Sequence, residues 1–212
     1  MVALAAVAEL YRVPDAPNWV GDLDGSTAIT WTPALGAAGV LLDRGSGFVA
    51  VEWIGVRVIA VYVSPNIGLA VFGDFLDRVG ECVGRCLPRQ VLVLGDFNAH
   101  STQWRNRRTN SWGRMLTDWA AGLGLLLANR GSASTCVAWR GSSVVDVTRT
   151  TSELFRRIHD WRVAEGVVTL PDHLYILTEV APRPHRQTTP KDEERTVPAH
   201  HRDGVSRRGI RR

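Results

Sequence analysis

The sequence predicts an α/β protein in which two packed mixed β-sheets are flanked by helices. Many short apolar, β-branched segments are separated by turn residues, and only three segments have helical spacing. Strands and helices do not alternate as they would in a βαβ sheet. A hydrophobic fraction of 45% and a charged fraction of 22% are ordinary for a globular chain, and 212 residues suit one large domain.

The first third of the chain contains most of the predicted strands. They cover residues 1–8, 27–31, 40–42, 48–53 and 57–63, and the last two pair around the turn at 54–56. Proline residues between positions 11 and 19 indicate a loop. The apolar N-terminus lacks a basic leader, so a buried strand is favoured over a signal peptide.

Two amphipathic helices follow. Residues 69–87 carry apolar side chains every three or four positions, and Pro88 ends the pattern. A buried strand over residues 91–94 comes next, then a polar loop from His100 to Asn110. The second helix spans 112–123, and glycines at its end lead into a buried strand at 125–128.

The last part of the domain returns to strands. Segments 135–139 and 143–148 form a hairpin around 140–142, residues 152–158 form a short helix, and strands cover 161–163, 167–170 and 174–180. Beyond residue 181 the pattern gives way to Pro, Arg, His and acids. We therefore expect one domain over residues 1–181 and a basic disordered tail or linker over 182–212.

Bulk properties exclude some classes of protein. No apolar run is long enough to span a membrane, so no membrane partner is expected. Three cysteines in a chain without a secretion signal are best explained as buried free thiols. The net charge of +4 arises in the tail, which carries nine Arg or Lys against four Asp or Glu. That tail either adds salt-dependent affinity for nucleic acid or is a passive linker.

The most informative stretch is the strand at residues 91–94 with the polar residues that follow it. Gly95 frees the backbone to turn, so Asp96 and Asn98 stand at the end of a rigid strand. A carboxylate and a carboxamide at this place suit a site that takes a proton and donates hydrogen bonds to an anion. A simple Asx-rich turn is the alternative explanation.

Five predicted strands end in polar groups of this kind. The groups are Glu9, Tyr62 with Asn66, Asp96 with Asn98, Asp146, and Asp172 with His173. Each alone has a structural explanation, but together they predict one cleft rimmed by strand ends. Several carboxylates without a Cys–His cluster suit Mg²⁺, with Mn²⁺ as the alternative ion. The His, Asn and Tyr suit a phosphate group beside that ion.

Four segments resemble the endonuclease/exonuclease/phosphatase (DNase I-like) superfamily. They are the Gly-Asp-Phe-Asn-Ala-His run at 95–100, the segments at 62–66 and 143–148, and Pro-Asp-His at 171–173. Residues 9–14 and 110–116 more narrowly resemble the apurinic-type endonuclease domain of non-LTR retrotransposons. The resemblance covers about residues 1–180 and implies a four-layer α/β sandwich.

The resemblance implies a role for each matching residue. Glu9 is the expected main Mg²⁺ ligand, and Asp172 is a direct or outer metal ligand. Asp96 orients or deprotonates the attacking water, and Asn98 holds the phosphate and Asp96. The same resemblance implies hydrolysis of a DNA phosphodiester.

The remaining matching residues contact the phosphate or support that contact. Tyr62 hydrogen-bonds the scissile phosphate, His173 donates to a non-bridging oxygen, and Asp146 orients His173. The nick leaves a 3′-hydroxyl that primes reverse transcription in the nucleus. The implied partner, besides double-stranded DNA, is a reverse transcriptase domain of the parent polyprotein, absent from these 212 residues.

Three departures from the family pattern bear on activity. The chain starts after the family's first strand and helix, and that strand carries an Asn of the metal site. Pro171 stands where a Ser or Thr is usual, and Leu10 replaces a Pro. Loss of the strand would leave backbone groups unpaired. A catalytically impaired DNA-binding remnant is therefore one alternative, and a superfamily phosphodiesterase or phosphatase on another substrate is the other.

The loop after the central strand is the main predicted DNA contact. His100, Trp104, Arg105, Arg107 and Arg108 combine phosphate-binding cations with a ring that stacks on a base. The alternative is a solvated loop with the Trp in the core. Arg140, at the predicted hairpin tip, and Asn66 are further candidate DNA contacts.

Overall fold

The computed structural model describes residues 3–139, 141–167 and 172–183. These residues fall in the first compact unit of the chain, Met1–Pro182, apart from Arg183. The predicted tail from residue 184 onward, the strand residues 168–170, Pro171 and Arg140 lie outside the described residues.

A six-stranded mixed sheet is the largest element of the fold. Its strands run in the order β4 (Val40–Gly45), β5 (Phe48–Trp53), β6 (Val56–Tyr62), β7 (Val91–Asp96), β11 (Asp146–Thr150) and β8 (Leu126–Leu127). The β6–β7 pair is parallel and the other pairs are antiparallel. The helix α1 (Leu69–Cys86) supplies the crossover that a parallel pair requires.

A second layer packs on one face of this sheet. It contains a three-stranded sheet in the order β1 (Leu4–Val7), β3 (Ala28–Trp31) and β2 (Trp19–Gly21), and a separate pair of β12 (Ile158–Val163) with β13 (Ile176–Val180). A small hairpin, β9 (Cys136–Ala138) with β10 (Gly141–Ser143), stands apart. Within the described residues, β1 and β13 are each paired along one edge only.

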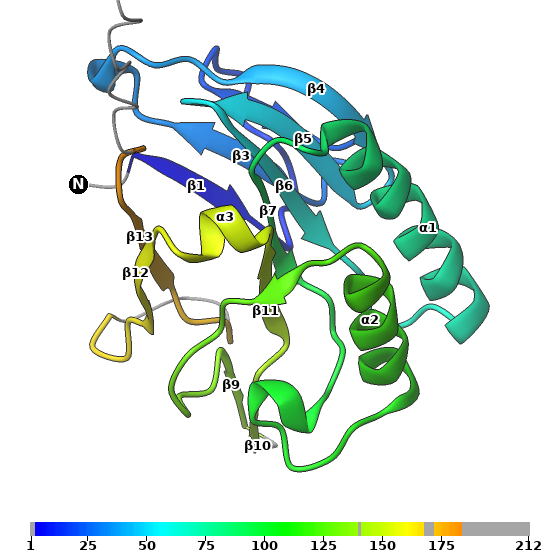
Figure 1. The fold of residues 1–212 in the computed structure, drawn as a ribbon. Helices are drawn as coiled ribbons and strands as arrows, with labels where there is room; N and C mark the ends of the chain where they lie inside the picture. Colours follow the sequence, from blue (N-terminus) through cyan, green and yellow to red (C-terminus); the bar gives the residue numbers. More distant parts are fainter. Residues whose placement is uncertain (1–2, 140, 168–171, 184–212) are drawn as a thin grey trace, which may run out of the picture. The chain divides into compact units, whose positions relative to one another are not determined.

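Two apolar cores lie on the two faces of the six-stranded sheet. The first joins the sheet to α1 and α2 (Ser111–Gly122). The second joins it to β1, β3, β12, β13 and the short helix α3 (Ser152–Phe155). Figure 1 shows α1 and α2 on one side of the sheet and β1, β12 and β13 on the other. The predicted α/β class of packed sheets with flanking helices is confirmed, with one mixed sheet and a second layer divided into two antiparallel sheets.

The predicted hairpin is wrong in its second half. Segment 143–148 is not one strand, because β10 ends at Ser143 and β11 begins at Asp146. The Asn106 side chain bonds both backbone polar groups of Val144, and Thr135 Oγ1 accepts from Val145 N at 3.1 Å. These side chains replace ladder hydrogen bonds and let the chain cross from the hairpin to the large sheet.

Other boundaries differ less. The strand β8 has two residues rather than four, since it lies at the sheet edge, where Leu126 is 41% exposed. The strand β2 was not predicted, and it begins at Trp19, the last residue of the predicted proline-containing loop. Short 3₁₀ turns occur at Pro33–Leu35 (η1) and Thr102–Trp104 (η2).

No helix in the described part is long and apolar enough to cross a membrane.

Candidate active site

Three of the predicted residues lie in one row across the large sheet. Asp96 pairs with Tyr62 of β6 on one side and with Asp146 of β11 on the other. Because side chains alternate along a strand, all three point to the face that carries the second layer, as Leu92 and Leu94 do. The backbone pairing of β6, β7 and β11 therefore fixes the spacing of these three side chains.

Gly95 makes this row possible, though not by ending the strand. The strand β7 continues through Gly95 to Asp96, so the predicted turn at Gly95 is wrong. Its φ is +143°, and a Cβ at this position would lie 2.0 Å from the carbonyl oxygen of Val61. Glycine is required because two neighbouring strands approach closely here.

Asp96 is fully buried and held from one side by Asn98. The Asn98 backbone N donates to Asp96 Oδ1 at 2.8 Å, and its Nδ2 donates to Asp96 Oδ2 at 2.8 Å. Burial raises the pKa of Asp96 to about 7, with the charge of Asp146 adding to the effect. Asn98 Nδ2 also donates to Val63 O, so both of its amide hydrogens are engaged within the protein.

Glu9 reaches the same place from the second layer. It lies in a bend after β1, with φ of +55°, a conformation that few residues other than glycine adopt. Tyr62 OH donates to Glu9 Oε1 at 3.3 Å. The pKa of Tyr62 is raised, first by partial burial and then by the Glu9 carboxylate.

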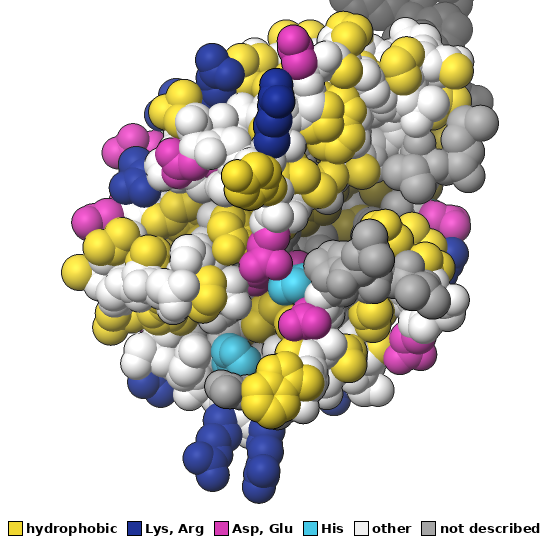
Figure 2. All heavy atoms as spheres, turned by 180° about the vertical axis from the view of Figure 1, so that it is seen from behind, with side chains coloured by type: hydrophobic (Ala, Val, Ile, Leu, Met, Phe, Trp, Pro, Cys, Tyr) yellow, Lys and Arg dark blue, Asp and Glu magenta, His cyan; other side chains and the backbone are white. Residues whose placement is uncertain are grey.

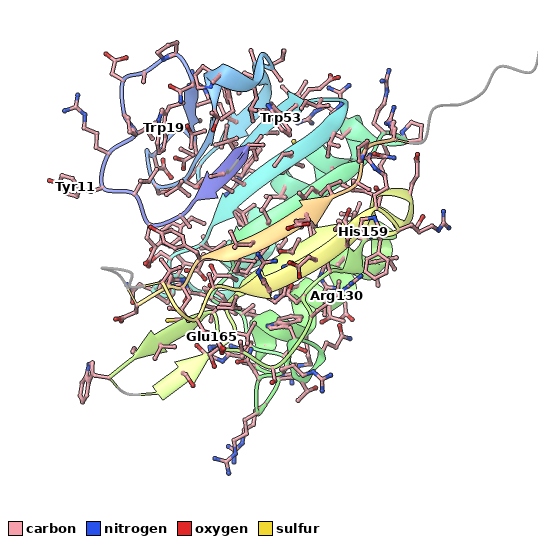
Figure 3. The ribbon with its side chains drawn as sticks, turned by 90° about the vertical axis from the view of Figure 1, so that its left-hand side faces the viewer. Tyr11, Trp19, Trp53, Arg130, His159 and Glu165 are labelled. Carbon is pink, nitrogen blue, oxygen red and sulfur yellow. The ribbon has the colours of Figure 1, made fainter. Side chains whose placement is uncertain are left out.

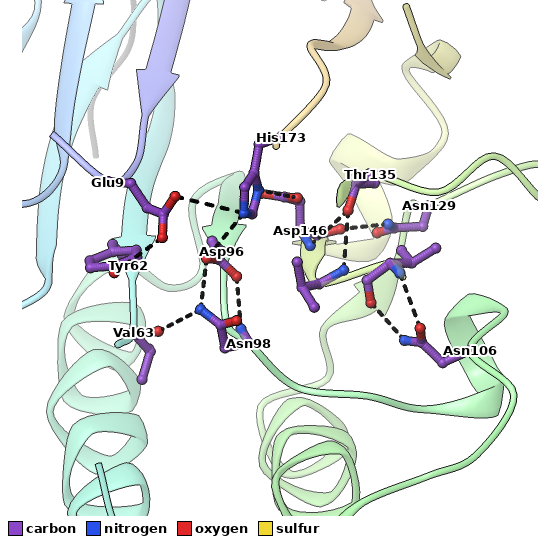
Figure 4. A network of polar contacts seen from close by, with 12 residues as sticks. Glu9, Tyr62, Val63, Asp96, Asn98, Asn106, Asn129, Thr135, Asp146 and His173 are labelled. Carbon is purple, nitrogen blue, oxygen red and sulfur yellow. Dashed lines mark hydrogen bonds and ion pairs between the residues drawn. The ribbon is translucent and has the colours of Figure 1, made fainter. Parts of the chain in front are cut away.

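His173 and Asp146 form the other side of the site. His173 Nδ1 and Asp146 Oδ2 are 3.0 Å apart, and this bond raises the pKa of His173 to about 9. Thr135 Oγ1 accepts from Asp146 N at 3.2 Å, and Asn129 Nδ2 donates to Asp146 O at 2.9 Å. Figure 4 shows the polar contacts that run from Tyr62 through Glu9 and His173 to Asp146, Thr135 and Asn129.

The far side of the imidazole faces two carboxylates. His173 Nε2 lies 3.8 Å from Glu9 Oε2 and 3.9 Å from Asp96 Oδ2. The ligand atoms of Glu9, Asp96 and His173 all lie within 4.8 Å of one another. Asp172 is exposed, and it is not part of this three-residue group.

Figure 2 shows acidic and histidine side chains near the middle of one face, and basic side chains projecting at the lower edge of that face. Asn66 is exposed beyond β6, and its backbone N donates to Ser64 Oγ. His100 is half-buried, which lowers its pKa. The predicted loop cations Arg105, Arg107 and Arg108 are exposed.

The predicted base stacking by Trp104 is wrong. Trp104 is 1% exposed, and its indole Nε1 donates to Ala99 O at 3.1 Å. A ring enclosed in the core has no face for a base. The exposed tryptophan is instead Trp139, at 86%, directly after β9.

Sequence reasoning missed Thr135, Asn129 and Trp139. The first two are polar residues between apolar runs, and nothing in their spacing indicates that they bond the backbone of β11. The hairpin with Trp139 is tied to the segment that carries His173, because Cys136 bridges to His173 and Val137 N donates to Asp172 O. A large aromatic residue next to a hairpin turn was the available signal.

Several solved structures share this fold. The endonuclease domain of TRAS1, a telomere-specific non-LTR retrotransposon, is 25% identical with a TM-score of 0.71, over 86% of this chain and 87% of that one. A 3′-5′ exonuclease (NExo) from Neisseria meningitidis is 15% identical with a TM-score of 0.60, over 84% and 80%. An AP endonuclease from Archaeoglobus fulgidus is 16% identical with a TM-score of 0.55, over 74% and 76%.

No curated protein sequence matches the chain. The family model described as endonuclease-reverse transcriptase matches residues 56–177. That range includes Tyr62, Asp96, Asn98, Asp146 and His173, the residues that build most of the polar site. With its DNase I-like fold and this match over more than half of its length, the chain belongs to the endonuclease-reverse transcriptase family.

Proposed function

We propose that this domain is a metal-dependent endonuclease that hydrolyses a phosphodiester bond of double-stranded DNA. The observation that carries the proposal is the cluster of Glu9, Asp96 and His173, whose ligand atoms lie within 4.8 Å of one another. Acidic oxygens, a cationic imidazole and a phenol at one point suit water attack on a phosphate.

The residues present fit a hard divalent cation. Glu9 is the proposed main ligand, and Asp96 lies close enough to share the ion, with Asp172 as the further carboxylate. The pKa of Asp96 at about 7 reflects burial and repulsion from neighbouring carboxylates, which a dication relieves. Mg²⁺ prefers such oxygen ligands, and Mn²⁺ accepts them too. When bound, the ion polarises the phosphate and stabilises the charge that develops on it.

The protein side chains divide the remaining work. Asp96, once ionised, accepts the proton of the attacking water, and Asn98 holds its carboxylate in place. His173 is cationic at neutral pH because Asp146 holds its Nδ1 proton. Its Nε2–H points between Glu9 and Asp96, where it can donate to a non-bridging oxygen. Tyr62 OH lies at the same edge as a second donor.

The DNA contacts are proposed along the margin of this site. The proposed contact residues lie in the loops after β6 and β7, and they are Asn66, His100, Arg105, Arg107 and Arg108. The hairpin with Trp139 stands beside His173, because Cys136 bridges to His173. Arg140, the next residue in the sequence, is a further proposed contact. Exposed guanidinium groups suit backbone phosphates, and an exposed indole suits a base.

The biological setting is proposed from the relatives. By analogy with the retrotransposon endonuclease domain, the nick leaves a 3′-hydroxyl that primes reverse transcription in the nucleus, by a reverse transcriptase of the same polyprotein.

One alternative is a catalytically silent DNA-binding domain. The unpaired edges of β1 and β13 within the described residues favour it, because Glu9 and His173 stand at the ends of these two strands. A phosphatase or phosphodiesterase acting on another substrate is the other alternative, since a related structure is described as a 3′ phosphatase.

Plasmid nicking tests these three functions. The purified chain should convert supercoiled plasmid to the open-circular form with Mg²⁺ and not with EDTA, and His173→Ala should fall to background. Wild-type nicking equal to that background would support the silent domain. Phosphate release from phosphoinositides or from 3′-phosphorylated DNA, without nicking, would support the phosphatase.

A further inference from the structure

A small cavity lies away from the catalytic cluster, between the η2 turn and the loop that follows β8. Its volume is about 110 Å³. Trp104, Trp161 and Val144 form apolar walls, and Gln103, Arg105 and Arg130 supply the polar groups. Glu9, Asp96 and His173 are not among the lining residues.

The two cations of this cavity lack a carboxylate partner within the described part of the chain. Arg130 donates to the carbonyl oxygens of His159 and Ile158, both at 3.3 Å, and its guanidinium lies over the Phe155 ring. Figure 3 shows Arg130 beside His159 of β12. Arg105 is exposed and forms no ion pair with a described residue.

A third cation lies behind one wall. Arg149 of β11 is 4% exposed, and its guanidinium lies 5.4 Å from the ring centre of Trp104. Its Nε and Nη2 have no hydrogen-bond partner among the residues that the structure describes. Burial lowers the pKa of Arg149 to about 10, so it stays charged at neutral pH. Buried charges are normally compensated, and no described acid compensates this one.

We propose that this cavity binds a phosphate-type oxyanion, either a DNA backbone phosphate or free phosphate. Arg105, Arg130 and Gln103 donate to its oxygens, and Arg149 contributes positive potential from beneath Trp104. A cavity of about 110 Å³ has room for one tetrahedral oxyanion.

Titration of inorganic phosphate into the metal-free protein tests the proposal. Binding is followed by ¹H–¹⁵N NMR at constant ionic strength, in EDTA. Wild type should bind saturably with shifts at Gln103, Arg130 and the Trp104 indole. Arg105→Asn and Arg130→Gln should each weaken binding about ten-fold. Asn suits position 105 because its φ is +70°.

A matched variant separates this cavity from general charge effects. Arg78→Gln removes the same charge from the exposed surface of α1, outside the cavity lining and the proposed DNA contacts, and it should bind phosphate as wild type does. Unchanged binding in Arg105→Asn and Arg130→Gln, or equal weakening in Arg78→Gln, would overturn the proposal. Because binding without metal is measured, failure here leaves the nicking prediction untouched.

Competition with DNA identifies the source of the oxyanion. If a backbone phosphate occupies the cavity, saturating inorganic phosphate should weaken binding of an oligonucleotide duplex at constant ionic strength, and Arg105→Asn should remove that competition. If free phosphate is the ligand, the duplex and phosphate should bind together, with an unchanged Kd for DNA.

Discussion

The six-stranded sheet and the layer packed on it are built differently. The central strands β5, β6 and β7 are paired on both sides, and most of their apolar side chains are buried. The second layer is divided into three strands and two strands, and every residue of β1 is half-exposed. The continuous sheet is a rigid base, whereas the divided layer relies on loops and on the core beneath it.

The candidate site takes residues from both regions. Tyr62, Asp96 and Asp146 belong to one row of the sheet, so backbone pairing sets their positions. Glu9 and His173 come from the divided layer. Glu9 is hydrogen-bonded to Tyr62 and His173 to Asp146, and electrostatic attraction between the imidazolium and the carboxylates adds to these bonds. Substitutions in the two regions should therefore have different consequences.

The largest expected effect is on nicking. Asp96→Asn should lower the nicking rate about 10²–10⁴-fold, because the proton acceptor is lost. The same change should not lower the melting temperature at pH 8. The folded pKa of Asp96, about 7, exceeds its usual value, so the ionised carboxylate destabilises the fold above that pH. Asp118→Asn, on the exposed face of α2, is the control and should change neither property. A marked loss of stability in Asp96→Asn would contradict this account.

The two regions should differ in how much a core leucine contributes. Leu92 of β7 and Leu4 of β1 both pack on the core between the layers, but Leu92 is 8% exposed and Leu4 is half-buried. Leu92→Ala should cost ~2–4 kcal/mol of the unfolding free energy. Leu4→Ala should cost about 1 kcal/mol, because the Leu4 side chain buries less apolar surface on folding. Urea unfolding measures both, and equal losses would show that the divided layer is as well packed as the sheet.

The hairpin attached to the divided layer should affect DNA binding without affecting stability. Trp139→Ala should weaken duplex binding by ~1–3 kcal/mol, the usual contribution of one stacked aromatic ring. Trp139→Phe should restore most of that affinity. Fluorescence anisotropy measures the Kd, and thermal melting should give equal midpoints. Wild-type DNA affinity in Trp139→Ala would show that the hairpin is not part of the proposed DNA-binding surface.

The smallest effect is expected from the exposed loop cations. Changing Arg107 or Arg108 to Ser should each reduce the slope of log K against log salt by about 0.9, one phosphate contact per residue. The measurement is duplex affinity across a series of salt concentrations. An unchanged slope in the double variant would mean that the loop does not follow the DNA backbone.

Much of the continuous sheet follows from local sequence. Residues 48–53, 57–63 and 91–94 are apolar and β-branched, so their strands were predicted within a residue or two. Tyr62 ends β6 and Asp96 ends β7, and both lie in one row with Asp146, the first residue of β11.

The rest depends on contacts between residues far apart in the chain. Trp104 lies in a loop of polar and basic residues, and only the surrounding core shows that it is buried. The break between β10 and β11 depends on Asn106, which is 38 positions from Val144. Likewise, local sequence does not reveal that Asn98 uses both amide hydrogens on Asp96 and Val63.

The central claim is that Glu9 and His173 of the divided layer are held against the acidic row of the sheet. The pKa of His173, measured by NMR titration of the metal-free protein, tests it most directly. A raised pKa means that imidazolium stabilises the fold below pH ~6.5, and that this contribution is lost as pH rises through about 9. We predict a pKa near 9 in wild type, a large decrease in Asp146→Asn and a smaller one in Glu9→Gln. A wild-type value near 6.5 that neither substitution moves would contradict the account.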